Sequence, residues 1–379
     1  SIKVIDFDLN FLGEVDDYKS AYFTRCWHRA GDFQINVDNL RHAAYLKVDN
    51  IVFINANKPY IIESIDINLD AATMIVKGRE LKSILDRRIT YPPLGLAYDY
   101  INSNSESIMK GYVDKNAISV TQNRIIANIQ IAQNLNRGIS TVYQTRYKNL
   151  LDELESLSLL SSLGYGIKLD LDGKKFIFDI YVGIDRKASQ VVNSRAIFCK
   201  DYDNIITQNY KEDQKNYKNY AIIGGQGEEE NRQIIEVEED VLNTGIKRKE
   251  VFIDARDSSE NTTLEERGRA KLSEFYKVIT LDTKVSEYPL VYEVDYDLGD
   301  IVTILEKSIG LTLDTRIIEI TENYDRTGFS INPVFGSNIP TFNSVFRSIK
   351  NNVQETIKEV ISATEPSSIA VGDYWLQTL

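Results

Sequence analysis

Short apolar runs that alternate with polar residues recur along most of this chain, and turn-forming residues separate them. In the first ninety residues these runs are Ile35–Val37, Ile51–Asn55, Tyr60–Ile67 and Thr73–Lys77. Further on, two more runs flank the dipeptide Asp172-Gly173, which is typical of a tight hairpin turn. An alternation of period two predicts strands with one buried face, so we expect antiparallel barrels or sandwiches.

Helical periodicity is confined to a few segments. After the break at Tyr91–Gly95, where paired prolines end any regular element, the pattern from Ala97 to Leu163 is mostly helical. We expect one helix there marked by Ile101, Ile108, Tyr112 and Val113, and a longer one over Tyr147–Leu163. Further helices are expected over Arg79–Arg88, over residues 262–279, and near the C-terminus, where one face comprises Phe342, Phe346, Ile349, Val353, Ile357 and Val360.

The order of these segments predicts a β-rich α+β chain with four parts. Residues 1–92 form a first barrel-like β domain, with residues 185–225 as candidates to complete it. An α/β insertion follows at 93–184. A second barrel-like β domain spans 185–340 and contains the helix 262–279, and residues 341–379 form a C-terminal helix and an extended tail.

Composition excludes several classes of function. The net charge of −12 argues against an extended nucleic-acid footprint and against binding to an anionic membrane surface. No apolar run approaches the roughly 20 residues that a transmembrane helix needs. Two cysteines, Cys26 and Cys199, and two histidines, His28 and His42, are too few and too scattered for a structural zinc site. We therefore expect no metal and no cofactor.

Four motifs suggest chemistry, and in each we favour a structural interpretation. Gly224–Glu230 lacks the Gly-Lys-Ser/Thr of a phosphate loop and is interpreted as a hairpin loop. Cys26 and His28 share a strand face but no orienting acid is apparent, which favours packing. Asp170–Gly173 begins like a calcium loop, but Tyr181 stands where the bidentate Glu belongs, so a hairpin turn is expected. The carboxylates Asp295, Asp297 and Asp300 flank a turn, and we expect Asp300 to bond the backbone of that turn.

Several stretches of the sequence resemble one known family. They are Trp27 with Gly31–Asn36, Lys77–Arg88, Phe198–Asn204, Asn219–Gly225, Gly245–Asp257 and Leu298–Ile304. In order and spacing they resemble the tail hub proteins of phages and phage-tail-like particles that attack Gram-positive bacteria. The resemblance extends over residues 1–340.

The resemblance implies a structural virion protein of the baseplate or tail tip and no catalytic residues. Three subunits, each with two similar barrels, would form a pseudo-sixfold ring around an axial channel for DNA ejection or tail firing. The implied partners are further copies of the chain, a distal tail or tail tube protein, and receptor-binding, fibre or spike proteins. Synthesis in the host cytoplasm, followed by incorporation into the tail, is expected.

Interface residues are predicted in the second barrel, in the C-terminal helix and in the tail. They are Arg248, Glu250, Arg256, Asp300, Phe342, Phe346, Ile349, Val353, Ile357 and Trp375. For the charged cluster around Arg248, a solvated strand face or an intersubunit salt-bridge network is favoured over nucleic-acid binding. Two functional alternatives stay open: a tail-associated cell-wall peptidase or glycosidase, and a carbohydrate-binding module that recognises the host.

Overall fold

The computed structural model describes residues 1–238, 244–256, 261–275, 277–286, 288–336, 359–362 and 374–377. The chain divides into two compact units. Unit 1 comprises Ser1–Asp213 and Ile279–Ser337, and unit 2 comprises Gln214–Val278 and Asn338–Leu379. The four-part division drawn from the sequence stays a prediction.

The first part of unit 1, here called the N-terminal strand half, is built from antiparallel strands. Its elements are β1 (Ile2–Ile5), β2 (Phe11–Val15), β3 (Tyr18–Cys26), β4 (Asp32–Val37), β5 (Ile51–Phe53), β6 (Tyr60–Asn68), β7 (Thr73–Glu80) and the 3₁₀ helix η1 (Leu81–Arg87). In β4 the residues Phe33, Ile35 and Val37 are buried while their neighbours are not, as the alternation predicts. Phe23, Phe33 and Tyr60 pack their rings together in the core of this half.

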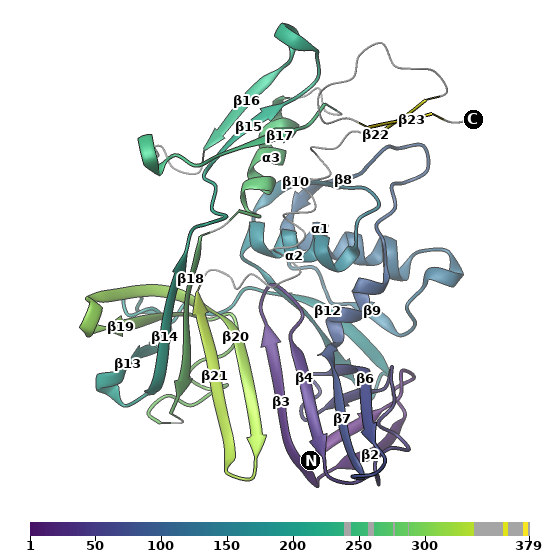
Figure 1. Ribbon diagram of the computed structural model, residues 1–379, viewed down its shortest axis with the longest axis vertical. Helices are drawn as coiled ribbons and strands as arrows, with labels where there is room; N and C mark the ends of the chain where they lie inside the picture. The colour runs from purple at the N-terminus through teal and green to yellow at the C-terminus, as the bar shows by residue number, and fades with distance from the viewer. Residues whose placement is uncertain are drawn as a thin grey trace. The chain divides into compact units, whose positions relative to one another are not determined.

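The C-terminal strand half has a core of its own, around Phe198, Tyr296 and Phe335. Its strands are β13 (Ile197–Cys199), β14 (Ile205–Asp213), β18 (Val278–Val285), β19 (Ile301–Glu306), β20 (Leu311–Asp325) and β21 (Gly328–Gly336). β20 pairs with β21, with β19 and, in antiparallel register from Glu319 opposite Cys26 to Asp325 opposite Ser20, with β3. β3 and β20 therefore lie side by side (Figure 1) and join both halves into one 13-stranded sheet.

The insertion, here residues 99–181, carries helices and a separate small sheet. Its elements are β8 (Asp99–Asn104), α1 (Ser105–Val113), the π-helical turn η2 (Asp114–Ile118), the 3₁₀ turn η3 (Gln122–Arg124), β9 (Ile129–Ile131), β10 (Ser140–Thr145), α2 (Leu150–Ser161), β11 (Gly164–Asp170) and β12 (Lys175–Tyr181). The Asn104 and Asn149 side chains cap α1 and α2 by accepting bonds from backbone N–H groups of the first turn. The hairpin predicted around Asp172-Gly173 is confirmed, because β11 and β12 pair antiparallel across that turn.

In unit 2, a three-stranded sheet packs against one helix. Its elements are β15 (Tyr220–Gly224), β16 (Ile234–Glu238), β17 (Glu250–Asp254) and α3 (Asn261–Leu272). β15 lies between antiparallel β16 and parallel β17, and Leu264 and Leu272 of α3 reach the apolar core with Ile223, Val237 and Ile253. The hairpin interpretation of Gly224–Glu230 is confirmed, since this segment connects β15 to β16. Farther along, β22 (Glu359–Ser362) and β23 (Tyr374–Gln377) pair in parallel.

The structure corrects several helix predictions. Ile101 belongs to β8, because α1 begins only after its cap Asn104. The segment after Arg79 forms the 3₁₀ helix η1. Helix α3 ends at Leu272 and not at residue 279, since Val278 already begins β18. At the C-terminus, Val360 lies in β22, while Phe342, Phe346, Ile349, Val353 and Ile357 lie outside the described residues.

The chain is thus α+β and strand-rich, as the sequence predicts. Among the described residues, no helix is both long and apolar enough to cross a membrane.

Candidate functional site

One indole ring, that of Trp27, lies where the three parts of unit 1 meet. Trp27 follows β3 directly, its backbone N donates to Ile318 O at 2.9 Å, and its ring Nε1 donates to Ser162 O at 3.1 Å. The side chain is only 4% exposed. A Cβ placed on Gly164 or on Gly299 would lie 2.6 Å or 2.0 Å from this ring. The two glycines are therefore required by the close approach of the indole to both backbones.

Lys82, in η1, ties the N-terminal strand half to the insertion. Its side chain is 2% exposed, and its Nζ donates to Cys26 O at 2.6 Å and to Tyr165 O at 3.2 Å. The Glu80 carboxylate lies 3.3 Å from the same ammonium and also accepts from the backbone N of Gly31 at 2.7 Å. A buried ammonium is tolerated here because each of its protons has an oxygen to bond.

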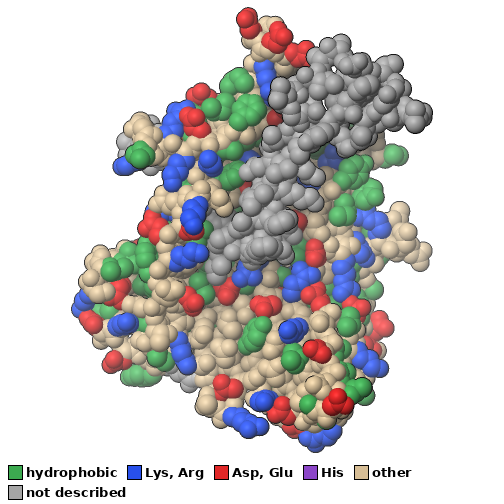
Figure 2. All heavy atoms as spheres, in the orientation of Figure 1, with side chains coloured by type: hydrophobic (Ala, Val, Ile, Leu, Met, Phe, Trp, Pro, Cys, Tyr) green, Lys and Arg blue, Asp and Glu red, His purple; other side chains and the backbone are tan. Residues whose placement is uncertain are grey.

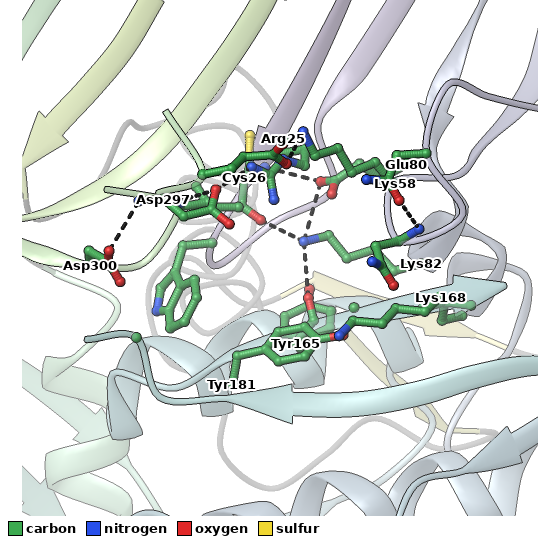
Figure 3. Close-up of a pocket in the computed structure, with 18 of the residues that line it drawn as sticks. Arg25, Cys26, Lys58, Glu80, Lys82, Tyr165, Lys168, Tyr181, Asp297 and Asp300 are labelled. Atoms are coloured by element: carbon green, nitrogen blue, oxygen red, sulfur yellow. Dashed lines mark hydrogen bonds and ion pairs between the residues drawn. The ribbon is translucent and has the colours of Figure 1, made fainter. Parts of the chain in front are cut away.

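Beside Trp27 and Lys82 lies a cavity of about 400 Å³, lined by residues of both strand halves and of the insertion. Residues 165–168 of β11 line one side of it. Along this strand Tyr165, Ile167 and Leu169 are buried, while Gly166 and Lys168 share the opposite face. Because Gly166 has no side chain, the Tyr181 ring can pack over its backbone. A Cβ added to Gly166 would lie 3.1 Å from that ring. Figure 3 shows the Lys168 side chain extending toward Tyr165 and Tyr181.

Ion pairs hold most of the charged side chains that line the cavity. They are Arg25–Asp297, Lys58–Glu293, Lys82–Glu80 and Arg186–Asp300. Burial alone would lower the pKa of the Arg25 guanidinium, but Tyr292, Asp297 and Glu322 together raise it. Lys58 also contacts Glu322 of β20, so the cavity wall is cross-linked to the central sheet.

Cys26 and His28, which the sequence places on one strand face, are both buried and each meets a partner of its own. His28 Nδ1 lies 2.7 Å from Ser158 Oγ, and burial lowers the pKa of His28 to about 3, helped by Arg316 and Lys82. Burial also raises the pKa of the Cys26 thiol well above its usual value. A neutral imidazole and a protonated thiol suit packing better than nucleophilic chemistry.

Asp16, Asp17 and His42 are the one group of metal-ligating side chains that gathers among the described residues. The His42 ring nitrogens already meet Tyr45 Oη and Asp17 Oδ1. Arg41 and Asn39 donate to the other Asp17 oxygen. These internal partners use the positions that a cation would need, so the donor set does not fit a metal.

The predicted interface residues fall in two places. In unit 2, Arg248 Nε pairs with Glu250 Oε1 at 2.6 Å while its guanidinium lies 3.3 Å from the centroid of the Tyr220 ring. Arg256 Nε pairs with Asp254 Oδ2 at 3.1 Å. In unit 1, Asp300 is 3% exposed and accepts from Asp297 N, as expected for the turn, and from Ile184 N and Arg186 Nε. Trp375 lies in β23, and the other predicted residues lie outside the described part of the chain.

Sequence reasoning missed Arg25, Lys58, Lys82, Lys168 and Tyr181. One local pattern could have indicated this surface. On a strand, Gly164, Gly166 and Lys168 share a face, and two residues without side chains leave space beside the lysine. The contributions of Arg25 and Lys58 depend on contacts with residues more than two hundred positions away, and no local pattern carries that information.

Comparison with known proteins decides the family. A sequence profile of the family described as Siphovirus ReqiPepy6 Gp37-like protein matches residues 1–337. The chain belongs to this family. This match confirms the resemblance to a family of phage proteins that was inferred from the sequence. No curated protein matches it significantly.

Solved structures of phage and prophage tail proteins share the fold of this chain. The 43 kDa tail protein of prophage MuSo2 from Shewanella oneidensis superposes with a TM-score of 0.55 at 11% identity, covering 88% of this chain and 97% of that one. Prophage tail protein gp18 from Listeria monocytogenes gives 0.53 at 14% identity, covering 93% and 99%. A tail protein from Neisseria meningitidis gives 0.51 at 12%, covering 88% and 95%. At such low identity the likeness establishes the fold alone.

Proposed function

We propose that this chain is a phage tail protein and serves as a hub subunit of the baseplate or tail tip. Three copies would form a ring that joins the tail tube to the host-attachment apparatus and surrounds an axial channel. The observation that carries the proposal is the continuous sheet through β3 and β20, which fixes two strand-rich halves, each with its own core, in one rigid unit. Two such halves in each of three copies supply six similar positions, the number that a sixfold tube presents.

The outermost strand of this sheet supports association between copies. In the described chain β14 pairs with β18 and stands at one end of the strand order. Most of its residues are exposed, and Ile206, at 55% exposure, shares a face with the exposed Tyr210. Exposed apolar side chains on the outermost strand of a sheet favour contact with another subunit.

Charge is compatible with a channel that DNA passes without adhering. The chain carries a net charge of −12, and acidic groups facing the channel would repel the phosphate backbone. On the described part of the face drawn in Figure 2, acidic and basic side chains are interspersed, with no broad basic field. In the same proposal, Arg248, Glu250, Arg256 and Trp375, together with the segment 342–357, contribute contacts to neighbouring subunits or tail proteins.

The test is the mass of the purified chain by light scattering, alone and with the tail tube protein of the same particle. We expect a trimer, or trimerisation upon addition of the tube protein. Ile206→Lys should weaken association, whereas Val191→Lys, at a position exposed in the loop before β13, should leave it unchanged. A monomer at high concentration in both conditions would overturn the hub proposal. Clearing of purified cell wall by the chain would instead support the hydrolase alternative.

A further inference from the structure

One cation that lines the cavity beside Trp27 has no acidic partner among the described residues. Among the described residues, its lining contains five cationic side chains, Arg25, Lys58, Lys82, Lys168 and Arg186, and four acidic ones, Glu80, Glu293, Asp297 and Asp300. Every acid is paired with one of the cations. Lys168 is the cation that remains, and it has no acidic partner in the described part of the chain.

The surroundings of Lys168 keep it at the cavity. Its Nζ lies 5.0 Å from the centroid of the Tyr181 ring, and both residues belong to the lining. A cation held against an aromatic face is only partly compensated, because the ring supplies a quadrupole and no counter-charge. Glu80 and Asp297 lie in the same lining but are committed to Lys82 and Arg25.

Three further donors of the lining lack acceptors among the described residues, and the buried Tyr165 hydroxyl is one of them. The Tyr181 hydroxyl forms no hydrogen bond with a described residue, and burial, with Asp179 and Glu80, raises its pKa, so the phenol remains protonated and able to donate. Arg25 Nε is buried and has no partner among the described residues. Unsatisfied donors in a polar cavity next to an uncompensated ammonium favour an occupant that brings acceptor oxygens and negative charge.

From this geometry we propose that the cavity binds a carboxylate group, with Lys168 as its counter-ion and the Tyr181 hydroxyl as a donor. A carboxylate supplies the single negative charge that Lys168 lacks, whereas a phosphate dianion would bring a second negative charge close to Glu293 and Asp297. A volume of about 400 Å³ accommodates a small organic acid or the end of a peptide and is too small for a folded domain. The source is either a free acid or the C-terminal carboxylate of another tail component. This inference does not depend on the hub proposal.

The test compares ligands that differ in charge but not in shape. In the full chain carrying Trp375→Phe, Trp27 is the remaining tryptophan and reports on the cavity it lines. We expect benzoate to change its fluorescence in a saturable titration and benzamide to have no effect. Lys168→Met should weaken benzoate binding at least about tenfold, the scale of one charge-assisted hydrogen bond. Lys168→Arg should retain binding, and Lys77→Met, which removes an exposed strand lysine, should change nothing.

Two more ligands distinguish a peptide C-terminus from a free acid as the source of the carboxylate. Tighter binding of N-acetyl-trialanine than of its C-terminal amide and of succinate indicates a peptide end, and tighter binding of succinate indicates a free acid. Thermal unfolding of the ligand-free Lys168→Met variant, expected to match that of the parent, shows that a loss of binding is not a loss of fold. Equal responses to benzoate and benzamide, no response to any carboxylate, or unchanged affinity in Lys168→Met would overturn the proposal.

Discussion

Gly299 presses its backbone against the indole ring of Trp27, so that a Cβ at position 299 would lie 2.0 Å from ring atom Cζ3. Gly299 also has a φ of +91°, a conformation that side chains of L-residues rarely adopt. The turn before β19 can therefore reach the end of β3 only because residue 299 lacks a side chain.

Gly299→Ala is expected to destabilise unit 1 by about 3 kcal/mol or more, since backbone strain and overlap with a buried ring add together. The measurement is urea unfolding followed by circular dichroism. Gly310→Ala is the matched control, because Gly310 also has a positive φ, +62°, but nothing lies within 4 Å of its added Cβ. It should cost only about 1 kcal/mol. Equal losses in the two variants would show that the contact with Trp27 is unimportant.

Lys82→Met is expected to destabilise the chain by about 2–4 kcal/mol. Methionine fills similar space, but it leaves the buried Cys26 and Tyr165 carbonyl oxygens without the donor that joins them. Glu80 loses its ammonium as well, although it keeps its bonds to the Cys26 and Gly31 backbone N–H groups. Thermal unfolding measures the loss, with the exposed Lys77→Met as control. A variant as stable as that control would contradict the role assigned to Lys82.

Many strands were predictable from sequence, and the reason is local. β8, β9 and β10, in a segment predicted to be mostly helical, and β14 were missed. In β4 and β12 the period of two in the residues is repeated in the burial of their side chains. Asp172-Gly173 fixes its hairpin within a few residues. The family could also be recognised from the sequence, because the motifs that resemble it occur in the same order along the chain.

The junction of the strand halves was not predictable from local patterns. β3 and β20 pair across almost three hundred residues, and the register from Cys26–Glu319 to Ser20–Asp325 is set by packing on both sides of the sheet. The start of α1 was missed although its signal is local. Apolar spacing extended a helix to Ile101, whereas the cap formed by Asn104 begins α1 after β8. The cavity depends on the pairing of distant strands and on where the helices end. Only the Gly-x-Gly-x-Lys pattern of β11 could be recognised from the sequence.

Glu106→Gln is expected to loosen the insertion by about 2–3 kcal/mol. The Glu106 side chain is fully buried and accepts from Lys110 Nζ at 2.7 Å and from Arg137 Nε and backbone N at 2.9 and 2.8 Å. Burial would raise the pKa of Glu106, but the bonds from Arg137 and Lys110 lower it, so the carboxylate is ionised. The Gln amide removes that charge and places its NH₂ group opposite the donors of Lys110 and Arg137.

Hydrogen exchange measured by mass spectrometry is the test for Glu106→Gln. Amides of α1 and of the segment around Arg137 should exchange faster, while those of β3 and β20 should be unaffected. Asp172→Asn, a carboxylate-to-amide change in an exposed turn of the same insertion, should leave the exchange pattern unchanged. Uniform acceleration over the whole chain would indicate a global rather than a local role for Glu106.

His28 is expected to make the stability of the chain depend on pH below neutrality. Its pKa is about 3 in the folded chain, because burial disfavours the charged ring, against 6.5 in an unconstrained one. As the pH falls below 6.5, His28 binds a proton in the unfolded state but not in the folded state. The free energy of unfolding therefore decreases down to about pH 3. The share due to His28 approaches about 1.4 kcal/mol per pH unit in that window. Carboxylates contribute to acid unfolding too, so a comparison of variants isolates this share.

In His28→Gln the residue cannot take up a proton in either state, so its stability should decline less steeply with acid than that of the parent chain. At pH 7.5 the variant should be less stable, because the packing of the imidazole and its contact with Ser158 are lost. The two curves of unfolding free energy against pH should therefore converge between pH 6.5 and 4. Ser158→Ala removes the same contact but keeps the buried ring. Its curve of unfolding free energy against pH should therefore be parallel to that of the parent chain. Parallel curves for His28→Gln would mean that His28 has the same pKa in the folded and unfolded chain, and that burial, Arg316 and Lys82 do not lower it.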